Sequence, residues 1–254
     1  MHSGITVLSA GFFLSQWRAQ GVGAACSFRA HDYALRAGQS AAEQLAVVNA
    51  RERWMRQFAF SPEHAVFMNQ THGSAAMVVA AADTGRGLRD PAQAVPQCDA
   101  LLCATPGIAL CALTADCAPV FLFDAARRVI ALVHAGWRGT RQNIVGRTVE
   151  SMCHTFASAP ENIRVFLGPA LRDCCFEVGE EFIGYFPHAV RRRGERLFFD
   201  IAAEIAGQAA RSGIPRAQIF DVKLCTHCLR DRFFSYRGGD RCARNLSVMS
   251  LCHV

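Results

Sequence analysis

The chain is organised around Ala115-Asp116-Cys117 and Val129-Ile130-Ala131-Leu132-Val133-His134-Ala135-Gly136-Trp137-Arg138-Gly139. Short apolar runs at 107–114, 121–123 and 129–133 predict three neighbouring buried strands. The first strand is expected to end on Asp116 and Cys117, and the third on His134. Functional side chains gather at strand ends, where loops sit on a rigid base. We therefore expect Cys117 and His134, 17 positions apart, to meet.

Length and composition predict one folded domain. The chain has 254 residues, of which 51% are hydrophobic, and single mixed folds often reach this size. Helical and strand patterns alternate without a regular repeat, and no Gly-rich phosphate loop is present. We expect a mixed α/β (α+β) fold, a single compact layered domain with mixed sheets flanked by helices. Residues 1–12 are expected to be an extension, and residues 13–254 the single folded domain.

The local patterns predict individual elements. Helices are expected over 40–60, 140–156, from about 180, and over 198–212, with Ser40 as a cap and Leu45, Val48, Trp54 and Phe58 on one face of the first. Further strands are expected at 22–28, 65–68, 77–81, 98–102, 163–167, 219–222 and 246–251.

Charge and cysteine content restrict the partners and the compartment. The net charge of +6 is modest, and Arg191-Arg192-Arg193 is interpreted as a solvated loop. Because no longer basic stripe with interleaved aromatics exists, we expect no nucleic-acid partner. Twelve cysteines in so long a chain indicate buried thiols in a reducing cytoplasm rather than a disulfide scaffold. The apolar run at 5–14 is too short to span a bilayer, so no membrane partner is expected; a signal peptide is the alternative.

Three residues suggest a metal site. His72 follows a predicted strand, and Cys117 and His134 end two others. Two imidazoles and a thiolate can bind a catalytic zinc and leave a fourth position open for water or substrate, and zinc lowers the pKa of bound water to about 7. Asp116 could orient a ligand or accept a proton, and Arg138, between two glycines, suits phosphate. The alternatives are a histidine beside a turn, a buried thiol, a capping Asp and a structural Arg.

Two other readings of the Cys and His residues stay open. Cys117 and His134 could be a nucleophile–base pair of a hydrolase, whereas a serine hydrolase is excluded because no Gly-x-Ser-x-Gly is present. Cys225-Thr226-His227-Cys228 could be half of a zinc site or a redox pair. No second Cys-x-x-Cys completes it, although Cys242, Cys252 and His253 follow. We interpret it as a coincidence in a cysteine-rich chain.

Several motifs together resemble the YfiH family, also known as laccase-domain or polyphenol-oxidase-like proteins and as multifunctional purine nucleoside phosphorylases. They span about residues 15–252 and are Gln70-Thr71-His72-Gly73, Cys98-Asp99-Ala100, Thr114-Ala115-Asp116-Cys117-Ala118-Pro119, His134-Ala135-Gly136-Trp137-Arg138-Gly139, Leu167-Gly168-Pro169-Ala170, Phe176-Glu177-Val178-Gly179, Cys225-Thr226 and Phe233-Phe234-Ser235-Tyr236-Arg237. The Ala-Asp-Cys and His-Ala-Gly-Trp-Arg-Gly motifs are the most specific of these.

The resemblance implies a layered α/β fold with its site in a surface cleft, and Zn2+ bound by His72, Cys117 and His134. It implies phosphorolysis of adenosine, inosine, guanosine and methylthioadenosine, deamination of adenosine, and a monomer. Asp116 and Arg138 are assigned to catalysis because of the chemistry and position described above. Arg29, Gln70, Phe176 and Arg237 are assigned to substrate binding.

The older laccase label implies copper and phenol oxidation instead. Nine histidines without a His-x-His pair do not supply a multicopper cluster, although one copper ion could give weak oxidation in vitro. A third alternative is a zinc-stabilised binding protein without turnover. The sequence departs from the family at 30–33, where its glycines are replaced, and at Ala50, Gly238 and Ala243, which we expect to change substrate preference more than metal binding.

Overall fold

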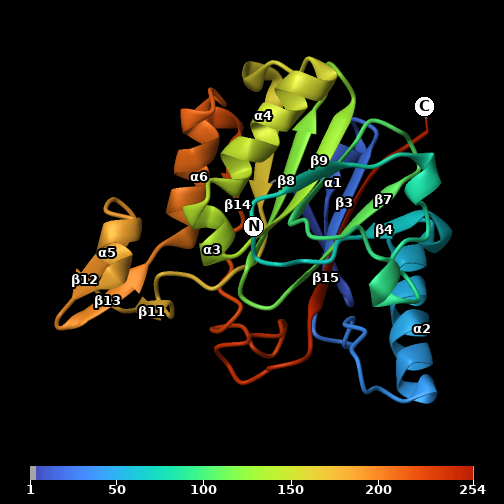
Figure 1. Ribbon diagram of the computed structural model, residues 1–254, viewed down its shortest axis with the longest axis horizontal. Coiled ribbons are helices and arrows are strands. Elements are labelled where there is room, and N and C mark those ends of the chain that lie inside the picture. Colours follow the sequence, from blue (N-terminus) through green and yellow to red (C-terminus); the bar gives the residue numbers. More distant parts are fainter. Residues whose placement is uncertain (1–3, 254) are drawn as a thin grey trace.

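Two six-stranded sheets stack face to face in the computed structural model, which describes residues 4–253 (Figure 1). The first sheet has, in spatial order, β1 (Ile5–Leu8), β2 (Gly11–Leu14), β3 (Val22–Ser27), β15 (Asn245–Leu251), β7 (Ala109–Thr114) and β4 (Ala65–Phe67). The second has β14 (Ile219–Asp221), β10 (Ile163–Leu167), β8 (Ala118–Asp124), β9 (Val129–Ala135), β6 (Ala100–Cys103) and β5 (Ala76–Val78). Both sheets are mixed, since one or two edge pairs in each are parallel.

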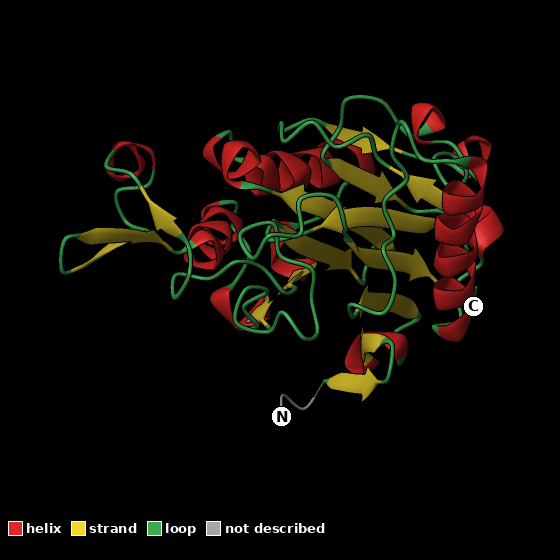
Figure 2. Cartoon of the chain, turned by 90° about the horizontal axis from the view of Figure 1, so that it is seen from below, coloured by secondary structure: helices red, strands yellow, loops and turns green. Residues whose placement is uncertain are grey.

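Helices cover the outer faces of both sheets (Figures 1 and 2). On the first sheet lies α2 (Ala41–Gln57), and on the second lie α4 (Ile144–Phe156) and α6 (Ile201–Arg211). Shorter helices are α1 (Ser15–Arg18), α3 (Trp137–Arg141) and α5 (Glu181–Tyr185). Single 3-10 turns lie at Pro62–His64, Ala81–Asp83, Pro91–Gln93, Pro160–Asn162 and Arg216–Gln218.

Successive side chains of the central strands point alternately to the two faces of the sheet, and both sets are packed in a core. In β9, Ile130 and Leu132 face the first sheet, while Val129, Ala131 and Val133 face the helices. Both faces of the strand are therefore buried, which is why its sequence is continuously apolar rather than alternating. His134 follows the same alternation and points to the side between the sheets.

A small third sheet extends from the body with α5 (Figure 1). It consists of β11 (Glu177–Val178), β13 (Arg196–Phe199) and β12 (Val190–Arg193). The triplet Arg191-Arg192-Arg193, expected in a solvated loop, is an exposed strand of this sheet. The turn at Gly194 allows the two strands to pair, since its φ of 59° is in the left-handed region.

The predicted mixed α/β class is confirmed, but three helix predictions need correction. The helix expected over 140–156 is broken by Asn143, whose φ of 61° and ψ of 42° lie in the left-handed region that Asn tolerates. The helix expected from 198 begins at Ile201, because Asp200 caps it and the residues before it form β13. Leu45, expected on the buried face of α2, is 56% exposed.

The ends of the chain add to the first sheet. Residues 5–14, most of which were expected to be an extension, form the β1–β2 hairpin that pairs with β3. The proposed boundary between residues 1–12 and 13–254 stays a prediction, and residues 1–3 lie outside the described part. Among residues 4–253, no helix is both long enough and apolar enough to cross a membrane.

Candidate functional site

His72, Cys117 and His134 meet at one end of the stacked sheets. Cys117 directly precedes β8, His134 is the penultimate residue of β9, and His72 lies in the loop that follows β4. Antiparallel pairing of β8 with β9 places Ala118 opposite Ala135, which brings Cys117 beside the end of β9. The potential ligand atoms of the three side chains lie within 4.8 Å of one another, and the two imidazole rings are 4.9 Å apart between centroids.

A buried carboxylate, Asp99, fixes both histidines. It accepts a hydrogen bond of 2.8 Å from His134 Nδ1 and one of 3.0 Å from the backbone N–H of His72. Further bonds come from the backbone and hydroxyl of Thr71 and from Gly73 N. Since Nδ1 of His134 faces Asp99, its Nε2 is left to face Cys117, and this carboxylate–histidine arrangement is typical of metal ligands.

Two glycines make room for this convergence. A Cβ on Gly136 would lie 3.0 Å from Cys117 Sγ and 3.1 Å from His72 Cδ2. A Cβ on Gly139 would lie 2.4 Å from the carbonyl oxygen of Gly73. The loop that carries His72 can therefore come this close to β9 and α3 only because residues 136 and 139 are glycines without side chains.

The thiol and the imidazole form a charged pair in the absence of a metal. Burial raises the pKa of Cys117, but the charge of His134 and hydrogen bonds from both histidines outweigh it and lower that pKa from 9.0 to about 6. Burial lowers the pKa of His134, yet the Cys117 thiolate and the hydrogen bond with Asp99 raise it from 6.5 to about 9. A cation would replace the imidazolium proton and use the same thiolate.

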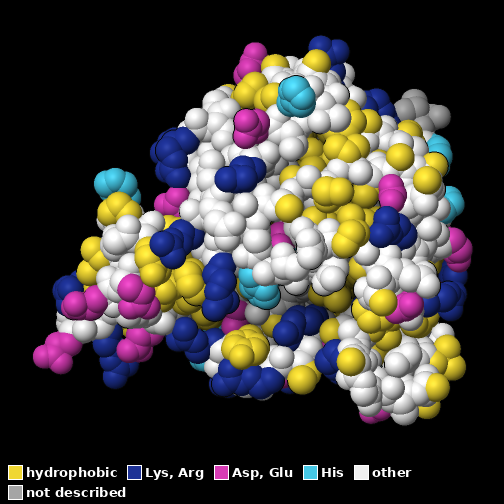
Figure 3. All heavy atoms as spheres, in the orientation of Figure 1, with side chains coloured by type: hydrophobic (Ala, Val, Ile, Leu, Met, Phe, Trp, Pro, Cys, Tyr) yellow, Lys and Arg dark blue, Asp and Glu magenta, His cyan; other side chains and the backbone are white. Residues whose placement is uncertain are grey.

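The three side chains line a cleft of about 790 Å³ that carries strong positive charge. Its walls include six arginines and a single carboxylate, Asp116; the arginines are Arg36, Arg51, Arg138, Arg237, Arg241 and Arg244. Of these six arginines, only Arg36 forms an ion pair with another residue of the described part of the chain, Asp32, at 2.6 Å. In Figure 3, Lys and Arg side chains gather around the lower middle of the face that is shown.

The predicted catalytic residues Asp116 and Arg138 both reach the cleft. Asp116 has a φ of 84°, and its carboxylate accepts bonds of 2.6 Å from Thr226 Oγ1 and 2.7 Å from Arg237 N. Arg138 is exposed, and its guanidinium lies 4.6 Å from the ring centroid of Trp137. An exposed, planar guanidinium can bind an anion through two of its nitrogens.

The four predicted substrate-binding residues differ in placement. Phe176 and Arg237 line the cleft, and Arg237 donates to the carbonyl of Glu177 at 3.0 Å. Gln70 also lines the cleft, but its side-chain amide donates to the carbonyl of Leu113 and accepts from the N–H of Leu113. Arg29 is not part of the cleft wall; it forms a two-pronged ion pair with Asp240 at 2.7 and 2.9 Å. Substrate contact by Arg29 stays a prediction.

Sequence reasoning did not assign roles to Asp99 or Arg51. For Asp99, the sequence does carry a signal: in Cys98-Asp99-Ala100 a carboxylate stands at the start of an otherwise apolar strand. Arg51 is 2% exposed and donates to the carbonyls of Tyr33, Gly87 and Leu88. It has no carboxylate partner within the described residues, so its charge adds to the cleft.

The donor set fits a catalytic zinc ion. Two imidazole nitrogens and a thiolate are common zinc ligands, and catalytic sites keep a fourth position open. One tetrahedral ion with bonds of about 2.0–2.3 Å holds its donor atoms roughly 3.3–3.8 Å apart. The donor atoms here all lie within 4.8 Å of one another, so small side-chain adjustments would complete the site. Among residues 4–253, the other grouping of potential ligands consists of four cysteines, so no histidine-rich cluster for several copper ions is present.

Comparison with known proteins identifies relatives with enzymatic names. A family model described as multi-copper polyphenol oxidoreductase laccase matches residues 14–252. Purine nucleoside phosphorylase YlmD of Geobacillus stearothermophilus is 32% identical over 75% of this chain and 73% of its own, and Adenosine deaminase RL5 of an unknown prokaryotic organism is 30% identical over 77% and 78%. The crystal structure of YlmD superposes with a TM-score of 0.91, at 26% identity over 98% of this chain and 99% of that one.

We predict that Asp99→Asn weakens zinc binding roughly 10- to 100-fold, because the change removes the charge that orients His134. Competition with a chromophoric chelator measures the affinity. Asp124→Asn is the matched control, since Asp124 is equally buried at the far end of β8. Equal zinc affinities of the two variants would contradict the role given to Asp99.

Gly136→Ala is expected to weaken zinc binding without unfolding the protein, because its methyl group would push Cys117 and His72 apart. Gly184→Ala in α5 is the control, since a Cβ there meets nothing within 4 Å. The same chelator competition, together with the melting temperature, separates loss of the site from loss of the fold. A Gly136→Ala protein with undiminished zinc affinity would show that the approach is not restrictive.

Proposed function

This chain belongs to the YfiH family, which the matching laccase-named model describes, and on that premise we propose that it is a zinc-dependent purine nucleoside phosphorylase with adenosine deaminase activity. The chain is an enzyme. One observation carries the proposal: His72, Cys117 and His134 converge in a cleft lined by arginines and aromatic side chains. The proposed substrates are adenosine, inosine, guanosine or methylthioadenosine, together with phosphate.

The metal is proposed to be zinc, held by His72, Cys117 and His134. It would supply a Lewis acid with an open coordination position. The role of the protein is to set the two imidazoles through Asp99 and to keep Cys117 as a thiolate. Asp116 would then orient a substrate hydroxyl or accept its proton, because Thr226 and Arg237 hold its carboxylate in place.

Phosphorolysis forms a bond between a phosphate oxygen and ribose C1′ and breaks the bond from C1′ to the purine nitrogen, which keeps the electron pair. The attacking phosphate is an anion, and the arginines of the cleft would bind it. Arg138 is the best placed, since it is exposed and its planar fork matches two phosphate oxygens. Phe176 and Tyr236 also line the cleft, and their rings provide apolar faces for a purine.

Two alternatives use the same residues. A copper-dependent polyphenol oxidase could use the His2Cys set for one copper ion, and oxidation that rises with added copper but is absent from the zinc form would mark adventitious copper. A Cys-His hydrolase would use the thiolate of Cys117 and the imidazolium of His134, whose shifted pKa values suit that chemistry. A hydrolase would keep its activity after metal removal and in His72→Ala.

We also propose that the enzyme acts as a monomer in a reducing cytoplasm. All twelve cysteines are free thiols, which is the state that a reducing compartment maintains.

The decisive experiment is a chromatographic assay of metal-quantified protein with adenosine, inosine and methylthioadenosine, with and without phosphate. We expect free base only with phosphate, and inosine from adenosine without it. His72→Ala and Cys117→Ser are expected to lose both activities. Full activity in either variant, or no turnover of any nucleoside by zinc-loaded protein, would overturn the proposal.

Arg138→Ala is expected to raise the KM for phosphate about tenfold or more, because it removes a charged contact to the anion. The KM for the nucleoside should change little. Arg216→Ala is the control, since Arg216 is exposed and does not line the cleft. An unchanged phosphate KM in Arg138→Ala would assign phosphate to the other arginines of the cleft.

A further inference from the structure

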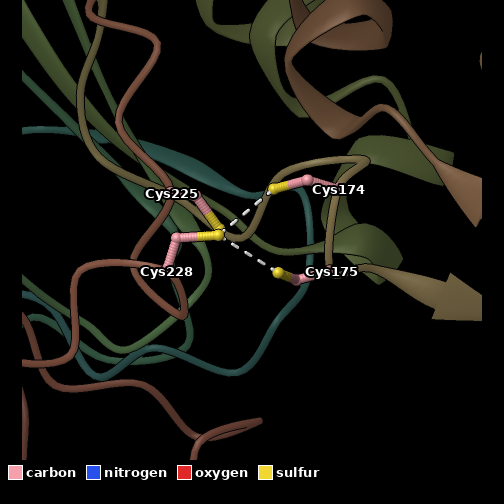
Figure 4. A group of neighbouring side chains, drawn as sticks. All are labelled: Cys174, Cys175, Cys225 and Cys228. Carbon is pink, nitrogen blue, oxygen red and sulfur yellow. Dashed lines mark hydrogen bonds between the residues drawn. The ribbon is translucent and has the colours of Figure 1, made fainter.

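Four cysteine thiols converge outside the cleft wall, where the sequence alone showed half a motif (Figure 4). Cys174 and Cys175 follow β10, and Cys225 and Cys228 follow β14. These strands are parallel neighbours, so the segments that leave them start from the same edge of the sheet. The missing half of the Cys-x-x-Cys pair is therefore an adjacent Cys-Cys pair about 50 residues earlier in the chain.

The sulfur positions suit one tetrahedral metal ion. All four Sγ atoms lie within 4.8 Å of one another, with 3.6 Å from Cys174 to Cys228 and 3.4 Å from Cys175 to Cys228. Zinc–sulfur bonds of about 2.3 Å in a tetrahedron place the sulfurs roughly 3.8 Å apart. An iron–sulfur cluster contains at least two iron ions between its cysteines and needs a wider cage. A single ion fits the observed spacing best.

The backbone holds the two segments together independently of any ion. Ala170 N donates to the carbonyl of Leu224 at 3.2 Å, and Thr226 N donates to the carbonyl of Ala170 at 3.0 Å. Beside them, Arg172 forms an ion pair with Asp221, with Nη1 at 2.8 Å from Oδ1. These contacts already hold the segments that carry the four thiols in place, so binding an ion would cost little additional conformational entropy.

The thiols also oppose one another's ionisation when no cation is present. Burial and the neighbouring sulfurs raise the pKa of Cys174 to about 12 and raise that of Cys175. Cys225 differs: burial raises its pKa, but the backbone N–H groups of Cys228 and Arg172 outweigh this and lower it. A cation bound by the four sulfurs would stabilise their negative charge.

We propose that Cys174, Cys175, Cys225 and Cys228 bind a second zinc ion, which is structural and separate from the ion proposed for the cleft. Four protein ligands leave no open position, which is the property of a structural zinc site. Cys225 is buried, while Cys174 and Cys228 are exposed, so the ion would lie at the surface with a route of entry.

This zinc ion would brace two segments that lead directly into the cleft. Cys175 precedes Phe176, and its carbonyl accepts from Arg237 Nη1 at 3.4 Å. Cys225 precedes Thr226, whose hydroxyl bonds to Asp116 at 2.6 Å. The ion would therefore act on the cleft by positioning its wall, and none of its ligands would touch the substrate.

The first test is the zinc content of protein purified under reducing conditions. We expect about two zinc ions per chain in the natural protein and about one in Cys174→Ser/Cys228→Ser. Cys117→Ser should also hold about one, and the triple variant none. Cys252→Ser is the control with unchanged content, because Cys252 is exposed and belongs to neither group.

A second test begins with the natural protein, so that no substitution can disturb its folding. Alkylation of the natural, zinc-loaded protein followed by mass spectrometry should show Cys174 and Cys228 protected and Cys252 modified, although all three are exposed. A chelator should release the protection. Cobalt substitution in Cys117→Ser should then give thiolate-to-cobalt charge-transfer absorption, and Cys225→Ser should remove it.

Three results would overturn the proposal. One is about one zinc ion per chain in the natural protein, lost with Cys117→Ser alone. Another is iron at the four cysteines, and the third is a disulfide between the two segments in freshly reduced protein. Because the readouts are metal content and thiol reactivity, failure here would leave the proposed phosphorylase activity untouched.

Discussion

The hydrogen bonds to the buried carboxylate of Asp99 are the interaction on which the site depends. Burying a carboxylate without partners would cost several kcal/mol, and here it receives five hydrogen bonds from Thr71, His72, Gly73 and His134. Each bond to a charged group contributes about 1.5–3 kcal/mol, so the set offsets the cost of burial. Desolvation raises the pKa of Asp99, but the bond from His134 and the others lower it, which keeps the group ionised at neutral pH.

The same carboxylate couples two parts of the chain that are far apart in sequence. It fixes the ring of His134 at the end of β9 and the backbone of the loop that carries His72. Cys117 approaches from the start of β8, and Gly136 leaves the space in which the three meet. The positive φ of 59° at His72 is held by bonds from this loop to Asp99, so local strain is stabilised by the same group that orients the ligand.

The sequence predicted the elements that are simple in pattern. Apolar runs buried on both faces identified β7, β8 and β9 as strands. The expected neighbourhood of the three was wrong, because β7 ends at Thr114 and lies in the first sheet, so that Asp116 and Cys117 belong to the turn that leads from it into β8 of the second. Ser40 caps α2 with the reciprocal bonds of a capping box to Glu43. The resemblance to a family directed attention to His72, Cys117 and His134, and the structure places them together. Spacing alone could not do so, because the distance from residue 72 to residue 117 in the chain carries no geometric information.

What escaped prediction depends on contacts between distant segments. No local pattern shows that Cys174-Cys175 meets Cys225 and Cys228, since the parallel pairing of β10 with β14 decides it. The break at Asn143 was also hidden, because no Gly or Pro stands between Thr140 and Ile144 to mark it. Arg51 lies within α2 and resembles any solvent-facing helical arginine in sequence. Only the fold shows that it is buried beneath the cleft and bonded to three carbonyls.

The charge of the cleft gives the strongest physical argument for an anionic substrate. Five of the arginines that line the cleft have no acidic partner in the described chain, and only one carboxylate lines the same cleft. At close range such charges repel one another, and in a partly buried cleft solvent screens them less than at an open surface. Burial lowers the pKa of Arg51 to about 10, so solvent stabilises this charge poorly. A bound phosphate would relieve this repulsion, and a neutral phenol would not. The electrostatics of the cleft therefore support the proposed phosphorolysis over phenol oxidation, whichever metal His72, Cys117 and His134 would hold.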